Sequence, residues 1–75
     1  MIKGVFKNGF IYSAVIDSDL NRCWVNKVNP HDKVALHIEL EYTSNLNIDD
    51  VLSLGMNLID NGDVNVEEYE NCLAM

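Results

Sequence analysis

Basic residues are scarce in this chain, and they stop early. Five Lys and Arg stand against twelve Asp and Glu, which gives a formal net charge of −7 and an isoelectric point near 4.4. Residues 1–33 hold all five bases and three acids, whereas residues 34–75 hold nine acids and no base. This balance argues against a direct nucleic-acid binder or an anionic-membrane binder, because both need a basic surface.

Cysteine and long apolar runs are also scarce. Cys23 and Cys72 are the only cysteines, which is too few for a disulfide-stapled secreted scaffold, and their spacing is not that of a metal site. No apolar stretch approaches the ~20 residues of a membrane helix. Residues 10–16 make a poor signal sequence because they contain Ser13 and lack a small-x-small cleavage site. We therefore expect a reduced, cytoplasmic protein.

The length of 75 residues allows one domain with a small core. Hydrophobic residues make up 48% of the chain, which is typical of a folded protein and not of an acidic disordered tail. We expect a single domain over residues 1–75, with a β-rich half at 1–45 and an acidic helical pair at 46–75.

The dipeptide Asn8-Gly9 separates two β-rich runs, residues 2–7 and 10–17. Asn-Gly in this setting predicts a hairpin with a two-residue type I′ turn, because both turn positions need positive φ. A two-residue loop also sets the register of the two strands. Apolar side chains then occupy both faces, with Ile2, Phe6, Ile11 and Val15 on one and Val5, Phe10, Tyr12 and Ile16 on the other.

Two further strands follow. Residues 18–21 form a turn-like cluster, so residues 22–28 are expected to return beside the second strand, with Trp24 on the first face. Residues 29–32 contain the single proline and break the pattern. Strict alternation of apolar and polar residues over 34–42 then predicts a half-buried strand. The expected sheet is antiparallel, with about four strands built from two consecutive hairpins plus a fourth strand.

After residue 45 the pattern changes to a helical period. Apolar residues from Ile48 to Ile59 span an arc of about 200°, and Asn61-Gly62 is a typical C-terminal stop. A second, shorter helix is predicted from about Val66 toward Met75. The expected fold class is therefore α+β, with an antiparallel sheet of about four strands followed by two C-terminal helices packed on it.

Both predicted helix starts share one order of residue types. An apolar residue, an Asn cap, an apolar residue, two acids and another apolar residue follow one another at 46–51 and at 64–69. The Asn side chain accepts hydrogen bonds from first-turn amides, and the acids complement the positive end of the helix. Capping therefore accounts for Asp49, Asp50, Glu67 and Glu68 without any function.

A leucine-rich helix followed by Asn61-Gly62-Asp63-Val64-Asn65-Val66-Glu67-Glu68-Tyr69-Glu70 and then Leu73 covers the C-terminal part of the chain. In this order residues 47–75 resemble the short helix-pair motif known as the SHOCT domain. The chain departs from that pattern because it stops soon after Leu73 and lacks the basic residues usual in the second helix. The resemblance implies an interaction or oligomerisation element and no catalytic residue.

No nucleophile, acid–base pair or cofactor loop is readable in the sequence. His31 and His37 have no ligand-type spacing to each other or to the cysteines. We expect a protein that is not an enzyme and that has no catalytic, cofactor-binding or metal-binding residues.

The predicted sheet is apolar on both faces, and two short helices cover one of them. The apolar face that the helices leave uncovered implies either a curled, barrel-like sheet or an exposed apolar surface. Large exposed apolar patches mark association sites. We therefore predict a homodimer or a tight complex with a partner protein.

The acidic surplus indicates the kind of partner. A protein with a basic groove is the natural complement, and such grooves normally hold DNA or RNA. The leading hypothesis is a small acidic inhibitor that occupies a nucleic-acid-binding surface of a host protein as a nucleic-acid mimic, as phage-encoded anti-CRISPR or anti-restriction proteins do. The predicted partner-binding residues are Glu39, Glu41, Asp49, Asp50, Asp60, Asp63, Glu67, Glu68 and Glu70.

A second hypothesis uses the same features differently. The chain is then a homo-oligomeric structural or regulatory subunit that associates through its apolar sheet face. In that case the mildly basic β half of one copy meets the acidic half of another.

Overall fold

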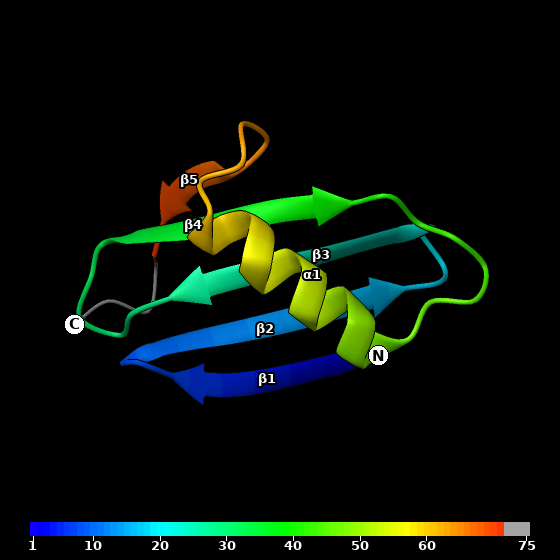
Figure 1. Cartoon of the computed structure of the whole chain (residues 1–75), viewed down its shortest axis with the longest axis horizontal. Coiled ribbons are helices and arrows are strands. Elements are labelled where there is room, and N and C mark those ends of the chain that lie inside the picture. The colour runs from blue at the N-terminus through cyan, green and yellow to red at the C-terminus, as the bar shows by residue number, and fades with distance from the viewer. Residues whose placement is uncertain (72–75) are drawn as a thin grey trace.

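The computed structural model describes residues 1–71, which form one sheet and one helix (Figure 1). All neighbouring strands are antiparallel, and their order in the sheet is their order in the chain. The elements are β1 (Ile2–Lys7), β2 (Phe10–Asp17), β3 (Arg22–Val28), β4 (Val34–Leu40), α1 (Ile48–Asp60) and β5 (Glu67–Glu70). This helix is too short and not apolar enough to cross a membrane.

The two predicted hairpins are confirmed, with the predicted registers. Asn8 and Gly9 have φ values of 54° and 83°, as a type I′ turn requires. Lys7 is opposite Phe10 at the β1–β2 turn. Trp24 of β3 is opposite Val15 of β2, as expected from a four-residue loop at 18–21.

Helix α1 begins and ends where the sequence predicts. The side chain of Asn47 accepts hydrogen bonds from the backbone N–H groups of Asp49 and Asp50 at 2.8 and 3.3 Å. At the other end Gly62 has a φ of 69°, and the N–H of Asp63 donates to the carbonyl of Leu58 at 3.0 Å. This Schellman arrangement satisfies a carbonyl that the last helical turn leaves without a partner.

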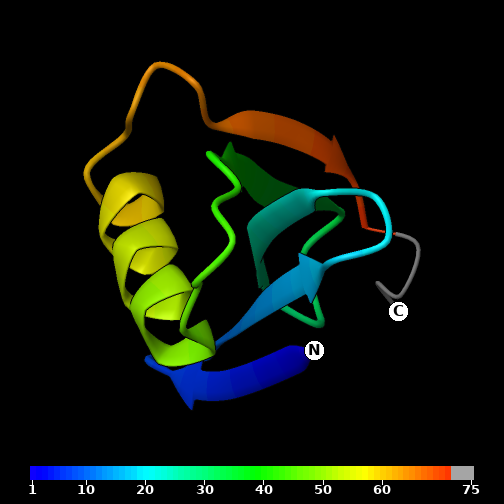
Figure 2. The ribbon, with the colours of Figure 1, turned by 90° about the vertical axis from the view of Figure 1, so that its right-hand side faces the viewer.

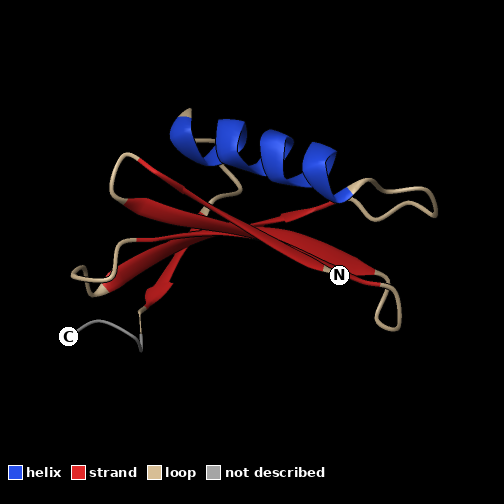
Figure 3. Cartoon of the chain, turned by 90° about the horizontal axis from the view of Figure 1, so that it is seen from below, coloured by secondary structure: helices blue, strands red, loops and turns tan. Residues whose placement is uncertain are grey.

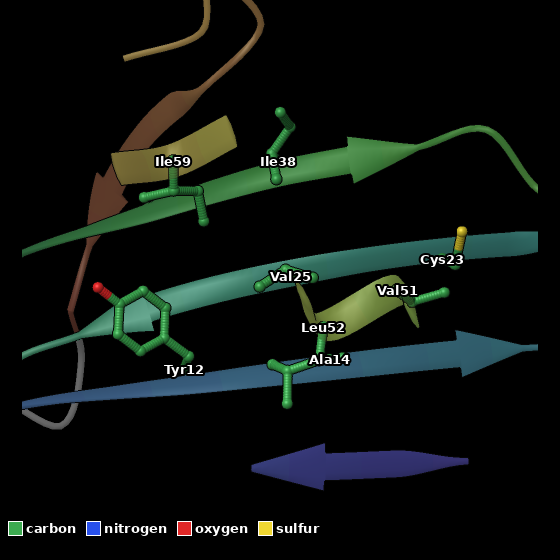
Figure 4. Packing of buried hydrophobic residues seen from close by; sticks show 8 residues of the cluster. All are labelled: Tyr12, Ala14, Cys23, Val25, Ile38, Val51, Leu52 and Ile59. Carbon is green, nitrogen blue, oxygen red and sulfur yellow. The ribbon is translucent and has the colours of Figure 1, made fainter. Parts of the chain in front are cut away.

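Helix α1 crosses one face of the sheet and leaves the opposite face without a helix (Figures 2 and 3). Together α1 and the sheet bury a single core, formed between the helix and the three central strands (Figure 4). The side chains of the core are Tyr12, Ala14, Cys23, Val25, Ile38, Val51, Leu52 and Ile59.

The predicted second helix is wrong, and with it the expected fold of four strands followed by two C-terminal helices. Residues 67–70 form β5, a fifth strand that pairs with β4, and α1 is the single helix of residues 1–71. A helix of about ten residues is marginal by itself, whereas the free edge of β4 offers ready backbone partners. Residues 72–75 of that predicted helix lie outside the described residues.

The residues expected to start this helix make a turn instead. The side chain of Asp63 accepts a hydrogen bond from the N–H of Asn65 at 2.9 Å, and the N–H of Val66 donates to the carbonyl of Asp63 at 3.0 Å. Asn65 therefore caps no helix, and the Asp63 turn leads the chain into β5. The buried side chain of Asn71 then donates to the carbonyls of Asn29 and Asp32 at 3.1 and 2.8 Å, which ties the end of β5 to the β3–β4 loop.

Candidate interaction surface

The sheet face opposite α1 is referred to below as the open face. Side chains alternate along a strand, so the register assigns each one to a face. The sequence left undecided which face is buried; the structure buries the face that carries Tyr12 and Val25. The apolar side chains of the open face include Ile2 and Phe6 of β1, Ile11 and Val15 of β2, Trp24 and Val28 of β3, and the buried Ala35 of β4.

Exposure of large apolar side chains on the open face is highest at β1. Ile2 is 72% exposed, Phe6 69% and Ile11 40%. Phe6 is opposite Ile11, and Ile11 is opposite Val28, so the apolar side chains form a row across three strands. The prediction of an exposed apolar sheet surface is confirmed. Of the two alternatives, the sheet is open and not a barrel, because β1 and β5 are its two ends.

A second row of side chains crosses β3, β4 and β5 on the same face. The guanidinium of Arg22 lies 5.2 Å from the centre of the Trp24 ring. The Trp24 and His37 ring centres are 6.4 Å apart, and those of His37 and Tyr69 are 6.1 Å apart. Nδ1 of His37 also lies 2.7 Å from Oδ1 of Asn26. These contacts hold the side chains of the row in place, as a preorganised binding surface requires.

A shallow groove lies at the β5 end of this row. Its volume is about 270 Å³, and its lining residues are Asn26, His37, Glu67 and Tyr69. Burial raises the pKa of the Tyr69 hydroxyl above its ordinary value. The hydroxyl is protonated at neutral pH and can donate a hydrogen bond. The groove therefore combines an aromatic wall with hydrogen-bonding groups and one acid.

Within the described part of the chain, three ion pairs involve predicted partner-binding acids. Each pair joins a base of the N-terminal half to an acid of the C-terminal half. The pairs are Lys3–Asp49, Arg22–Glu39 and Lys27–Asp60. Part of the charge separation seen in the sequence is therefore cancelled by contacts inside one molecule.

The carboxylate of Asp60 accepts hydrogen bonds from two side chains. Lys27 donates to its carboxylate at 2.8 Å, and the buried Tyr12 donates at 2.8 and 3.1 Å. The hydrogen bond from Lys27 is the main cause that lowers the pKa of the Asp60 carboxyl. Lys27 also lies 4.3 Å from the centre of the Phe10 ring. Asp60 therefore fastens the end of α1 to β2 and β3 and is a structural residue.

Glu39 lies on the open face and forms a bidentate ion pair with Arg22. The distances are 3.0 Å from Nε and 2.5 Å from Nη2. These hydrogen bonds lower the pKa of the Glu39 carboxyl and raise that of the Arg22 guanidinium. Arg22 was not among the predicted site residues, although its position beside Trp24 follows from the predicted register.

The other acids are distributed around the sheet and do not form one cluster. Glu67 lies on the open face opposite His37, whereas Glu68 lies on the α1 side opposite Leu36. Asp50 is in the first turn of α1, and Glu41 follows β4. The two remaining residues are Asp63, in the loop after α1, and Glu70, opposite Val34.

The titratable groups of the described chain do not form a metal site. Among residues 1–71, no group of three His, Cys, Asp or Glu side chains could hold a metal ion. Cys23 is buried in the core beside a cavity of about 170 Å³, and burial raises the pKa of its thiol. A raised pKa disfavours the thiolate that a nucleophile needs.

The open face is thus the most distinctive surface of the described residues. It brings together exposed apolar side chains, a fixed aromatic row and two of the predicted partner-binding acids, Glu39 and Glu67. Comparison of this chain with known protein families, curated proteins and solved structures gives no match. The resemblance of residues 47–75 to the SHOCT motif stays a prediction.

Proposed function

We propose that this chain is a non-enzymatic protein-binding protein whose open face docks on a partner with a basic surface. The observation that carries the proposal is the exposure of Ile2 and Phe6 on a sheet face that α1 does not cover. Large apolar side chains next to one another on a small domain cost solubility, and such patches are typical of association sites.

The aromatic row on β3, β4 and β5 also supports the open face as the binding surface. Tyr, Trp and Arg are the side chains most enriched among residues that dominate binding energy. Trp24 and Arg22 are held against each other, and Tyr69 is held against His37, so little side-chain entropy is lost when a partner binds.

The charge of the chain favours a basic partner. The net charge is −7, and no described residue forms an ion pair with Glu41, Asp50, Glu67 or Glu68. Complementary charge accelerates encounter and disfavours acidic partners. The partner class that we favour is a nucleic-acid-binding protein whose basic surface this chain occupies, which makes the function inhibitory.

Affinity capture with matched variants tests this proposal. The immobilised chain is exposed to a cell lysate, and retained proteins are eluted with increasing salt and identified by mass spectrometry. Ile11→Asp places a charge in the middle of the apolar row formed by Phe6, Ile11 and Val28 and is expected to abolish capture. Leu54→Asp, on the exposed side of α1 at 52% exposure, is the control and should leave capture unchanged.

Two further experiments test the role of charge and the class of the partner separately. Glu67→Lys is expected to weaken capture, whereas Asp19→Lys, in the β2–β3 turn, is not. Duplex DNA or RNA added as a competitor should displace the chain from its partner. Partners that withstand salt, ignore the competitor and bind Ile11→Asp normally would contradict the proposal.

A further inference from the structure

Strand β1 carries Lys3 and Lys7 but is the less protected of the two edges of the sheet. It has six residues, contains no proline, and is the first strand in the sheet order, so no described strand covers its outer side. The opposite edge, β5, has four residues, three of which are Glu. Short length and charge are the usual ways in which proteins block an edge from pairing, and by these criteria β5 is blocked more than β1.

The direction of the backbone groups of β1 follows from its pairing with β2. The N–H of Ile16 donates to the carbonyl of Met1 at 2.8 Å, and the terminal amine of Met1 donates to the carbonyl of Ile16 at 2.9 Å. Bonded and non-bonded pairs alternate along an antiparallel ladder. The backbone groups of Lys3, Val5 and Lys7 therefore face β2, and those of Ile2, Gly4 and Phe6 face outward.

We propose that this edge pairs with the β1 edge of a second copy, in an antiparallel two-fold dimer centred on Gly4. Outward-facing residues must meet outward-facing residues, so a full-length antiparallel pairing has one register. In that register Gly4 is opposite Gly4 of the second copy, and Ile2 is opposite Phe6. The dimer then has one continuous sheet of ten strands, counting five from each copy.

The side chains favour this register. Ile2 and Phe6 are among the most exposed large apolar side chains of the chain, and the pairing places them in cross-strand contact on the open face. On the α1 side Lys3 meets Val5 and Lys7 meets Met1, so no two lysines are directly opposite. Lys3 is also ion-paired with Asp49 of its own chain, which reduces the repulsion across the dimer axis.

Dimerisation of this kind joins the two open faces side by side. It leaves Ile11, Trp24 and Tyr69 uncovered, because the contact is made at the edge and not by stacking of the two faces. The inference does not rest on the proposed function. A dimer that binds no external partner would support edge pairing alone, and a monomer that binds a partner would support the proposed function alone.

The oligomeric state in solution is the first measurement. Sedimentation equilibrium or light scattering over a wide concentration range is expected to give a mass of twice 8.5 kDa at high concentration. A mass of 8.5 kDa throughout would overturn the proposal. A series of species larger than a dimer would overturn it as well, because that result indicates head-to-tail pairing of β1 with β5.

Substitution of Gly4 distinguishes edge pairing from stacking of the open faces. Gly4→Pro removes an outward N–H and leaves the hydrogen bonds to β2 in place, so the chain should fold and be monomeric. Gly4→Ala is the matched control: its Cβ would lie 3.6 Å from the carbonyl oxygen of Tyr12, an ordinary contact, and its N–H remains. The control should dimerise. A dimer that survives Gly4→Pro would refute edge pairing.

Cross-linking decides the register even if Gly4→Pro fails to fold. In a Cys72→Ser background, Gly4→Cys places two thiols opposite each other at the dimer axis, at about 5.5 Å between Cα atoms, which suits a disulfide. Oxidation should give a covalent dimer in high yield. Ser13→Cys, on the open face of β2, should remain monomeric under the same conditions. Equal yields for the two variants, or no cross-link at residue 4, would count against the proposed register.

Discussion

Gly55 of α1 lies directly above Val25 of β3. A Cβ atom at residue 55 would lie 2.2 Å from Cγ2 of Val25 and 2.5 Å from its Cβ. Val25 is fully buried and β-branched, so it has little freedom to move aside. The absence of a side chain at residue 55 therefore sets how closely the helix approaches the sheet.

Gly55→Ala is expected to destabilise the protein. Alanine favours the helix by about 1 kcal/mol over glycine, but overpacking a tight contact costs about 1–3 kcal/mol. Because the contact involves the Cβ of Val25 as well as a methyl group, we expect the clash to dominate, with a net loss of up to about 2 kcal/mol by these magnitudes. Urea denaturation followed by circular dichroism measures this change.

The double variant Val25→Ala/Gly55→Ala is the control for this prediction. Removing the Val25 methyl groups relieves the contacts of the new Cβ with Cγ1 and Cγ2 but not its contact with the Val25 Cβ. The relief is therefore partial, and the double variant should lose less stability than the two single variants together. Strict additivity of the two effects would show that the Val25 contact is not the cause.

Asp60→Asn is expected to make stability less dependent on acid pH. The pKa of the Asp60 carboxyl is lowered in the folded state, chiefly by the hydrogen bond from Lys27. Its stabilising contribution is therefore complete above the unfolded pKa of about 4 and is lost as the pH falls through the lower folded value. Since the Asp60 side chain is 38% exposed, solvent screening limits the effect to about 0.5–1 kcal/mol.

The pH effect is measured as the free energy of unfolding at a series of pH values from neutral downward. The wild type should lose more stability than Asp60→Asn over the acid range. Asp19→Asn, an exposed acid in the β2–β3 turn, serves as the control and should follow the wild-type curve. Parallel curves for the wild type and Asp60→Asn would disprove the assigned role.

Asn71→Ala is expected to destabilise the protein by about 1–3 kcal/mol, because it removes two hydrogen bonds that each contribute about 0.5–1.5 kcal/mol. The Asn71 side chain is buried and donates to two carbonyls of the β3–β4 loop, those of Asn29 and Asp32. Hydrogen exchange should show faster opening of β5 than of the central strands. Asn65→Ala, at an exposed position, should have little effect.

Cys23 is expected to react slowly with thiol reagents in the native state. Its side chain is fully buried, and burial raises the pKa of the thiol. In a Cys72→Ser variant, labelling with a disulfide reagent at mildly alkaline pH should be slow and should accelerate with urea, in step with unfolding. Rapid labelling of the folded variant would show that the core beside Cys23 opens readily.

Local signals in the sequence correctly predicted most of the first sixty residues. The Asn8-Gly9 turn and the strict alternation over 34–40 act within a few residues. They determine the backbone conformation and the sheet face of each side chain, so the strands and their registers follow. Asn47 and Gly62 likewise define the ends of α1 through hydrogen bonds to neighbouring backbone groups. An exposed apolar sheet face was also readable, because one helix layer covers one side of a two-sided sheet.

Three outcomes depended on contacts between distant parts of the chain. Residues 64–69 carry the same capping pattern as the start of α1, yet they form a turn and β5, since the free edge of β4 supplies backbone partners that a local pattern does not report. The ion pairs of Asp49, Glu39 and Asp60 needed the fold to bring the two halves together. The face on which α1 packs, where Gly55 lies close to Val25, also depended on contacts between the helix and the sheet. Local hydrogen bonding and periodicity thus determined α1 and the first four strands. Sheet-edge pairing and side-chain packing act between distant parts of the chain, and they decided the fifth strand, the surface charge and the exposed face.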